Sequence, residues 1–284
     1  MQAQRDEAWH DQQYNNRARV ADSAHILGRW TEASALVRRQ LDARLDLAYG
    51  DGPTERLDVF AAEQPNSPVL LFIHGGYWRA LDKSDHSFVA PAFLKAGAAV
   101  VVPSYGLCPQ VSIAQIALQL SQALAWAWRH AREFGGDPSR IGVVGHSAGA
   151  HLAAMLLCCR WKEVAADLPQ RPILGALGLS GVYDLEPLRH VPFLRDDLQL
   201  DASAVRRLSP AYFPRPRGPL LAAVGALESD EFLRQNQLIR DQWGPTTVPV
   251  CETIPHRNHF DILHDLVDAS SRVHHLALRA LGLV

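Results

Sequence analysis

Cysteine and long apolar runs are both scarce in this sequence, and each shortage excludes a class of protein. The 284 residues include four cysteines, whose irregular spacing offers neither a disulfide framework nor a paired CxxC zinc pattern (Cys108, Cys158, Cys159 and Cys251). No run reaches the roughly 18 uninterrupted apolar residues of a membrane-spanning helix, and the polar N-terminus lacks the apolar core of a signal peptide. We therefore expect reduced thiols, no membrane partner and a cytoplasmic location.

Neither positive nor negative charge is in large excess. The chain carries 28 Lys and Arg against 30 Asp and Glu, a formal net charge of -2. Short basic clusters such as Arg38 with Arg39 are typical of solvated surfaces or helix ends, so a nucleic-acid partner is not expected. No internal repeat or long linker divides the sequence. With 48% hydrophobic residues, the chain is long enough for one buried core, and a single α/β domain over 1–284 is favoured.

Apolar runs that end at turn residues alternate with helical patterns along most of the chain. A helical N-terminal segment (1–40) is followed by two short strands that flank a turn and predict a hairpin. Strands are expected at 43–50, 55–62, 67–76, 98–105, 141–145, 172–180, 219–227 and 247–254. Helices are expected at 86–96, at 112–133, directly after Ser147, at 230–243 and at 260–281.

Strands that alternate with helices imply parallel crossovers. The sequence therefore predicts an α/β fold with a doubly wound, mostly parallel sheet of about eight strands and helices on both faces. A less regular, proline-bearing region at 182–217 interrupts the alternation. We interpret it as a small cap insertion over the strand ends.

The segment GHSAG places Ser147 between Gly145 and Gly149. It matches G-x-S-x-G at the junction of a predicted strand and a predicted helix, the context in which a serine becomes an exposed nucleophile. The glycines are needed because a strand that turns directly into a helix leaves no room for side chains. The alternative is a tight turn in which Ser147 merely caps the helix.

A nucleophilic serine needs a base and an acid that follow it in the order serine, acid, histidine. The segment HRNHF follows the last predicted strand and supplies His256 and His259; His259 is preferred because it opens the closing helix. Glu228, Asp230 and Glu231 follow the preceding strand. At least two of these three acids are expected only to face the N-terminus of a helix.

An oxyanion needs donors, and the segment HGGYW follows the predicted strand at 67–76. Its paired glycines let backbone N–H groups point at a ligand without obstruction. A plain glycine turn is the alternative. Together with the serine, acid and histidine in order, this segment favours a serine hydrolase.

These motifs resemble the α/β-hydrolase superfamily, in the branch of the hormone-sensitive-lipase-like esterases and the arylformamidases (kynurenine formamidases). The stretches HGGYW, GHSAGAHLAAMLL, SGVYDLEPL, ESDEFLRQ and NHFDILH are most similar to the arylformamidases, and QYNNRARV resembles the N-terminal segment of bacterial members. The resemblance implies an α/β-hydrolase fold with Ser147 as nucleophile, His259 as base and Glu228 as acid. Several relatives have aspartate where this chain has Glu228, so Asp230 stays in reserve.

By the same resemblance, the backbone N–H groups of Gly76, Tyr77 and Ala148 are the oxyanion donors. Tyr77 and Trp78 are candidates for stacking on an aromatic substrate, although core packing is an equal alternative for Trp78. The resemblance implies a small-molecule substrate, no cofactor and no metal, and leaves a homodimer open.

The implied reaction is hydrolysis of an N-formyl aromatic amide, N-formyl-L-kynurenine, to kynurenine and formate. A carboxylesterase acting on small acyl or aryl esters would use the same residues. A hydrolase-fold binding protein without activity is a further alternative. A metal hydrolase built on His256, His259 and His264 is remote, because the sequence has no HExxH motif.

Overall fold

The computed structural model describes residues 6–284, and the strands within them form one eight-stranded sheet. The strand order is β1-β2-β4-β3-β5-β6-β7-β8. β1 pairs antiparallel with β2 and β2 antiparallel with β4, whereas all the other pairs are parallel. The bounds are β1 Ala43–Ala48, β2 Arg56–Phe60, β3 Ser67–Ile73, β4 Ala99–Pro103, β5 Gly136–His146, β6 Ile173–Leu179, β7 Leu220–Gly225 and β8 Val250–Ile254. The predicted hairpin and the mostly parallel sheet are confirmed.

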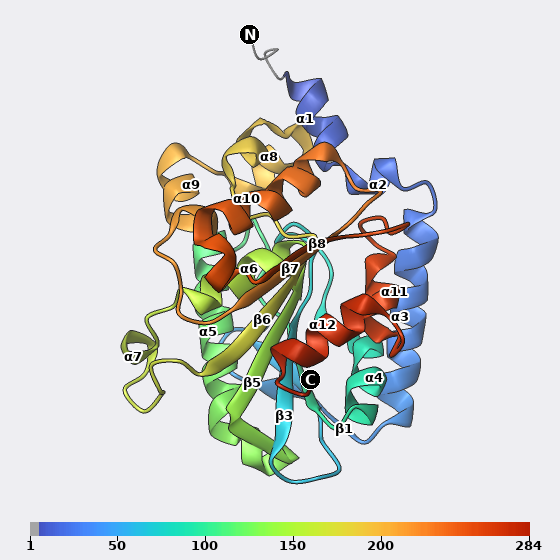
Figure 1. Ribbon diagram of the computed structural model, residues 1–284, viewed down its shortest axis with the longest axis vertical. Helices are drawn as coiled ribbons and strands as arrows, with labels where there is room; N and C mark the ends of the chain where they lie inside the picture. Colours follow the sequence, from blue (N-terminus) through green and yellow to red (C-terminus); the bar gives the residue numbers. More distant parts are fainter. Residues whose placement is uncertain (1–5) are drawn as a thin grey trace.

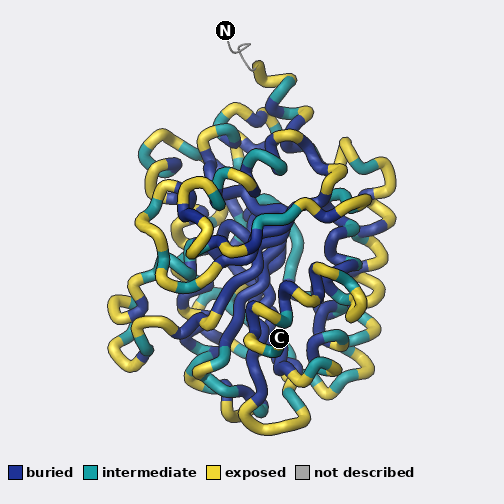
Figure 2. The backbone as a smooth tube through the Cα atoms, viewed as in Figure 1, coloured by how far each residue is buried: buried dark blue, intermediate teal, exposed yellow. Residues whose placement is uncertain are grey.

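Side chains alternate across the sheet and build a core on each face. Every residue of β3 is buried; Leu71 packs in one hydrophobic cluster and Leu70, its neighbour, in the other. This pattern follows from the period of two in a strand, and a continuous apolar run is what a strand covered on both faces requires. Figure 2 shows the strands as the buried centre of the molecule, with the exposed positions on the surrounding helices and loops.

Helices cover both faces of the sheet (Figure 1). One cluster contains residues of α3 (Ser23–Gln40), α4 (Ala90–Lys95), α11 (Ile262–Val267) and α12 (Arg272–Ala280). The other contains residues of α5 (Ile113–His130), α6 (Ala148–Leu157) and α10 (Asp230–Thr247), with α7 (Trp161–Val164) at its margin. The α5 helix begins with a capping box, in which the side chains of Ser112 and Gln115 each accept the other residue's backbone N–H.

Three predicted elements differ from the structure. The closing helix expected at 260–281 is divided into α11 and α12, because Asp268 accepts hydrogen bonds from Ser270 and the Ser271 side chain caps α12. The helix expected at 86–96 begins as 3₁₀ turns, η1 (Lys83–Asp85) and η2 (Ser87–Val89), before α4. β5 starts at Gly136, so that residues expected to form a turn extend the strand instead.

Short helices lie above the carboxyl ends of the strands (Figure 1). They belong to the region at 182–217 and comprise η4 (Glu186–His190), α8 (Pro192–Leu198), α9 (Ala202–Leu208) and η5 (Pro210–Tyr212). The N-terminal helix α1 (Glu7–Tyr14) contacts α8, α10 and η4 and leads into α2 (Asn16–Arg19). The Tyr14 hydroxyl donates to the Glu231 carboxylate of α10 at 2.8 Å, which ties the start of the chain to this end of the sheet.

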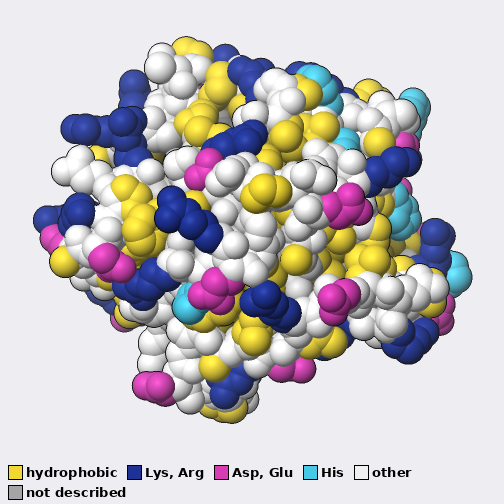
Figure 3. Space-filling view, turned by 90° about the horizontal axis from the view of Figure 1, so that it is seen from below, with side chains coloured by type: hydrophobic (Ala, Val, Ile, Leu, Met, Phe, Trp, Pro, Cys, Tyr) yellow, Lys and Arg dark blue, Asp and Glu magenta, His cyan; other side chains and the backbone are white. Residues whose placement is uncertain are grey.

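The surface carries mixed charge. Figure 3 shows Lys and Arg interspersed with Asp and Glu on the face seen from below, with apolar side chains scattered between them. None of the helices in residues 6–284 is long and apolar enough to cross a membrane.

Candidate active site

Ser147 occupies the sharp turn between β5 and α6. Its backbone dihedrals are φ 56° and ψ -117°, a strained conformation for a residue with a side chain. The turn is tight because a Cβ atom on Gly145 would lie 2.1 Å from the carbonyl oxygen of Gly149, and one on Gly149 would lie 2.0 Å from that of Ile73. Only glycine fits at these two positions, so the local sequence forces Ser147 to the corner.

Two hydrogen bonds connect Ser147 to residues more than 80 positions later in the chain. The Ser147 Oγ lies 3.1 Å from His259 Nε2, and His259 Nδ1 lies 2.7 Å from Glu228 Oε2. Because a carboxylate can only accept, Nδ1 carries the ring proton and Nε2 is left to accept the serine proton. All three residues are buried. The structure therefore brings together the serine, histidine and acid that the sequence singled out.

The environment of Glu228 fixes its carboxylate. Oε1 accepts from the Ser180 hydroxyl at 2.5 Å and from the Gly225 backbone N–H at 2.8 Å, while Oε2 faces His259. The other two acids lie elsewhere: Asp230 is exposed on the first turn of α10, and Glu231 binds Tyr14 and Arg234. Of the three candidate acids, Glu228 is the one bonded to the histidine.

The loop after β3 packs directly against the serine. A Cβ atom on Gly75 would lie 3.0 Å from the Cβ of Ser147. The next three residues all have positive φ, 106° at Gly76, 50° at Tyr77 and 57° at Trp78. No acceptor within residues 6–284 takes a hydrogen bond from the amide N–H of Tyr77 or Ala148. These donors are available to a ligand at the start of α6, where negative charge is favoured.

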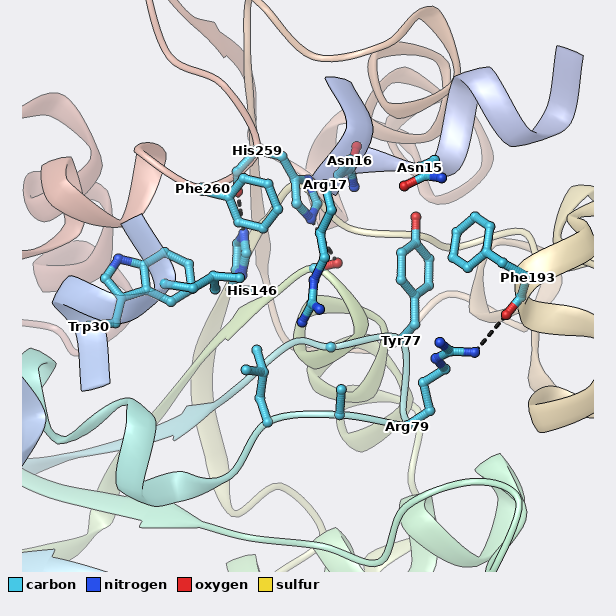
Figure 4. A pocket seen from close by; sticks show the side chains of 15 residues that line it. Asn15, Asn16, Arg17, Trp30, Tyr77, Arg79, His146, Phe193, His259 and Phe260 are labelled. Atoms are coloured by element: carbon cyan, nitrogen blue, oxygen red, sulfur yellow. Dashed lines mark hydrogen bonds between the residues drawn. The ribbon is translucent and has the colours of Figure 1, made fainter. Parts of the chain in front are cut away.

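A cavity of about 300 Å³ opens at Ser147, a size typical of small-molecule pockets. Figure 4 shows its wall of aromatic and polar side chains. It is lined by Asn15, Asn16, Arg17, Leu27, Trp30, Gly76, Tyr77, Arg79, Ala80, Leu81, His146, Ser147, Phe193, His259 and Phe260.

Of the two residues considered for substrate stacking, only one lines this cavity. Tyr77 does, and its hydroxyl donates to the backbone carbonyl of Tyr14 at 2.6 Å. Trp78 is fully buried and packs edge to face on His151, with ring centroids 5.0 Å apart. The alternative of core packing therefore holds for Trp78.

Sequence reasoning missed several residues around the site. His146 precedes the serine, and its Nε2 donates to the backbone carbonyl of His259 at 2.7 Å. Burial and the neighbouring His259 lower the pKa of His146 well below its ordinary value, so its ring is neutral and can hold this contact. Ser180, with φ 53°, is a second strained residue and binds the acid. The one available signal in the sequence is their position: His146 lies within GHSAG and Ser180 begins SGVYDLEPL.

The histidines considered for a metal site do not converge. His256 is exposed, whereas His259 faces the serine. No group of three or more His, Cys, Asp or Glu within the described residues could hold a metal ion.

Comparisons with known proteins agree with the fold. A family model described as BD-FAE matches residues 57–168. The chain is similar to kynurenine formamidase of Danio rerio, with 29% identity over 270 residues, 91% of this chain and 88% of the relative.

Solved structures give the same result. A protein of Silicibacter sp. TM1040 with a provisional thioesterase assignment is 31% identical, with a TM-score of 0.84 over 94% of this chain and 98% of that one. An esterase of Pyrobaculum calidifontis shares the fold at 16% identity, with a TM-score of 0.70 and coverage of 94% and 95%. The chain belongs to the α/β-hydrolase superfamily, in the branch of the arylformamidases and the hormone-sensitive-lipase-like esterases, and is an enzyme of the serine hydrolase class.

Proposed function

We propose that Ser147 is the nucleophile of an acyl-transfer reaction, with His259 as general base and Glu228 as the acid that orients it. The observation that carries this proposal is the continuous chain of hydrogen bonds from Ser147 Oγ through the imidazole to Glu228. A serine hydroxyl is a weak nucleophile by itself, and this arrangement supplies the base that activates it.

The reaction proceeds in two halves. Ser147 Oγ attacks the acyl carbon while its proton passes to His259 Nε2; Glu228 stabilises the imidazolium that forms. The oxyanion accepts hydrogen bonds from the N–H groups of Gly76, Tyr77 and Ala148. The carbon–nitrogen bond then breaks as His259 returns the proton to the leaving nitrogen. Water that is deprotonated by His259 finally releases the acid from Ser147.

The substrate is an N-formyl aromatic amide, N-formyl-L-kynurenine, which yields kynurenine and formate. The similarity to a kynurenine formamidase over nine-tenths of the chain supports this assignment, as do the aromatic walls of the cavity at Trp30, Tyr77 and Phe260. An aniline-type nitrogen leaves more readily than an alkyl amine because its lone pair is delocalised into the ring, so a site of the esterase type suffices.

The chain functions as one domain over 1–284 in the cytoplasm. The region at 182–217 acts as a cap, since Phe193 of α8 contributes to the cavity wall.

A substrate panel tests the assignment. We expect kcat/KM for N-formyl-L-kynurenine to exceed that for p-nitrophenyl acetate and p-nitrophenyl butyrate, measured with purified protein. Fast ester hydrolysis without formamide turnover would instead establish a carboxylesterase.

The acid is tested by a pair of isosteric variants. Glu228→Gln should lower kcat by about 10²–10⁴-fold, because the amide can no longer stabilise the charged imidazolium. Asp230→Asn, an equal change of charge two residues away, should stay within about twofold. Steady-state kinetics on both proteins would show a wrong acid if Asp230→Asn had the larger effect.

A further inference from the structure

The cavity at Ser147 has an unbalanced charge. Its wall contains two arginines and no aspartate or glutamate. Glu228 lies behind His259 with a fully buried side chain, and the neutral ring of His146 adds no charge. A cavity that presents cationic side chains without a carboxylate is complementary to an anionic ligand.

The two arginines differ in their partners. Arg79 forms an ion pair with Asp197 and donates to the backbone carbonyl of Phe193. The guanidinium of Arg17 has no carboxylate partner within residues 6–284. Figure 4 shows the Arg17 side chain reaching from α2 into the cavity between His146 and Tyr77. Arg17 is therefore the cation that a bound ligand can neutralise.

A second unpaired donor lies beside Arg17. Asn16 is only 5% exposed, and its Nδ2 atom has no hydrogen-bond acceptor among the described residues. A buried amide without an acceptor costs about 1–3 kcal/mol, so a ligand that offers an acceptor at this wall would gain binding free energy from Asn16. Asn15 differs from Asn16 because it is only half-buried, and its side chain caps α2 through Oδ1, which accepts from Ala18 N–H.

The segment that bears these residues is held in place. Tyr14 donates to Glu231 and accepts, through its backbone carbonyl, from the Tyr77 hydroxyl. The Glu231 carboxylate also binds the Arg234 guanidinium. Tyr77 belongs to the loop that contributes oxyanion donors, so the start of α2 is connected to the reacting centre through one side chain.

We propose that Arg17, assisted by Asn16, binds a carboxylate on the leaving group of the substrate. This inference rests on the proposed function. The acyl half of the proposed substrate is a formyl group, which carries no further substituent, so a carboxylate must lie on the amine that leaves. A guanidinium suits this task, since its planar donors match the two oxygens of a carboxylate. The preferred substrates are therefore aryl formamides whose amine half carries an acid.

The test compares N-formyl-L-kynurenine with its carboxamide, which removes the negative charge and keeps the shape. Arg17→Gln should raise KM for the acid about tenfold or more and leave KM for the carboxamide within about twofold. We expect little change in kcat, because a contact with a group remote from the reacting bond stabilises the bound substrate and the transition state equally. Arg17→Lys should recover part of the loss. Arg19→Gln is the matched control, because Arg19 lies in α2 and does not line the cavity. Equal effects on the acid and the carboxamide would overturn the inference.

A binding measurement separates this inference from the proposed function. Calorimetric titration with L-kynurenine and with its carboxamide requires no turnover. Suppose that the enzyme hydrolyses neither formamide, binds L-kynurenine at least tenfold more tightly than its carboxamide, and loses this preference in Arg17→Gln. The reaction would then be misassigned, whereas the carboxylate site would be supported. The absence of any preference in the unaltered protein would refute the site.

Discussion

Replacing Ser147 with alanine is expected to lower kcat by a factor of about 10⁴–10⁶, because the attacking oxygen is removed while the rest of the cavity persists. Residual activity should remain above the rate in water, since the oxyanion donors do not depend on the serine side chain. His259→Ala should cost a similar factor. Because the two residues act as a unit, the double variant should lose hardly more than either single variant. Steady-state kinetics on the three proteins measures this non-additivity.

Ser121→Ala provides the control for Ser147→Ala. Ser121 is a buried serine of α5 whose hydroxyl donates to the Leu118 carbonyl and which does not line the cavity. Its variant should keep full activity and react with a fluorophosphonate probe, whereas Ser147→Ala should not be labelled. Labelling of the Ser147 variant would show that another residue is the nucleophile.

Adding one methyl group at Gly149 is expected to destabilise the fold severely. The new Cβ would lie 2.0 Å from the carbonyl oxygen of Ile73 and 2.7 Å from that of His74, and both are backbone atoms that cannot rotate away. We expect Gly149→Ala to lower the free energy of unfolding by roughly 3 kcal/mol or more, the upper end of the range for overpacking a close-packed interior. Denaturant unfolding followed by circular dichroism measures the loss.

Gly28→Ala is the matched substitution. Gly28 lies inside α3, and no heavy atom is within 4 Å of the position that a Cβ atom would take there. At this site the same methyl group should stabilise the protein by about 0.5–1 kcal/mol, because alanine has a higher helix propensity than glycine. If both variants unfolded at the same denaturant concentration, the close approach of α6 to β3 at Gly149 would be contradicted.

Local patterns were sufficient to predict the sheet and to single out the serine, acid and histidine that meet in the structure. Buried parallel strands read as uninterrupted apolar runs, as in β3, and the glycines around Ser147 report a steric constraint that acts between near neighbours in sequence. The fold prediction is confirmed by the eight-stranded sheet. The distance between Ser147 and His259, although they are 112 positions apart, follows from the topology, since parallel strands end at one edge.

Contacts between distant parts of the chain determine those features of the site and fold that local sequence patterns do not predict. Trp78 follows Tyr77 in sequence and both have positive φ, yet Trp78 is buried in the core whereas Tyr77 lines the cavity. Ser180 and Arg17 join the site through contacts between distant elements, which no spacing rule encodes. The closing helix was expected to be continuous from 260 to 281; the break between α11 and α12 depends on the hydrogen bonds that Asp268 accepts.

The Tyr14–Glu231 contact has an evolutionary consequence. It holds residues 15–17 at the wall of a cavity whose proposed reacting groups all come from positions 76–259. The proposed reacting groups and the proposed carboxylate site thus come from separate stretches of the polypeptide. Descendants of a common ancestor could exchange their opening segments and acquire new preferences while conserving the same bond-breaking apparatus.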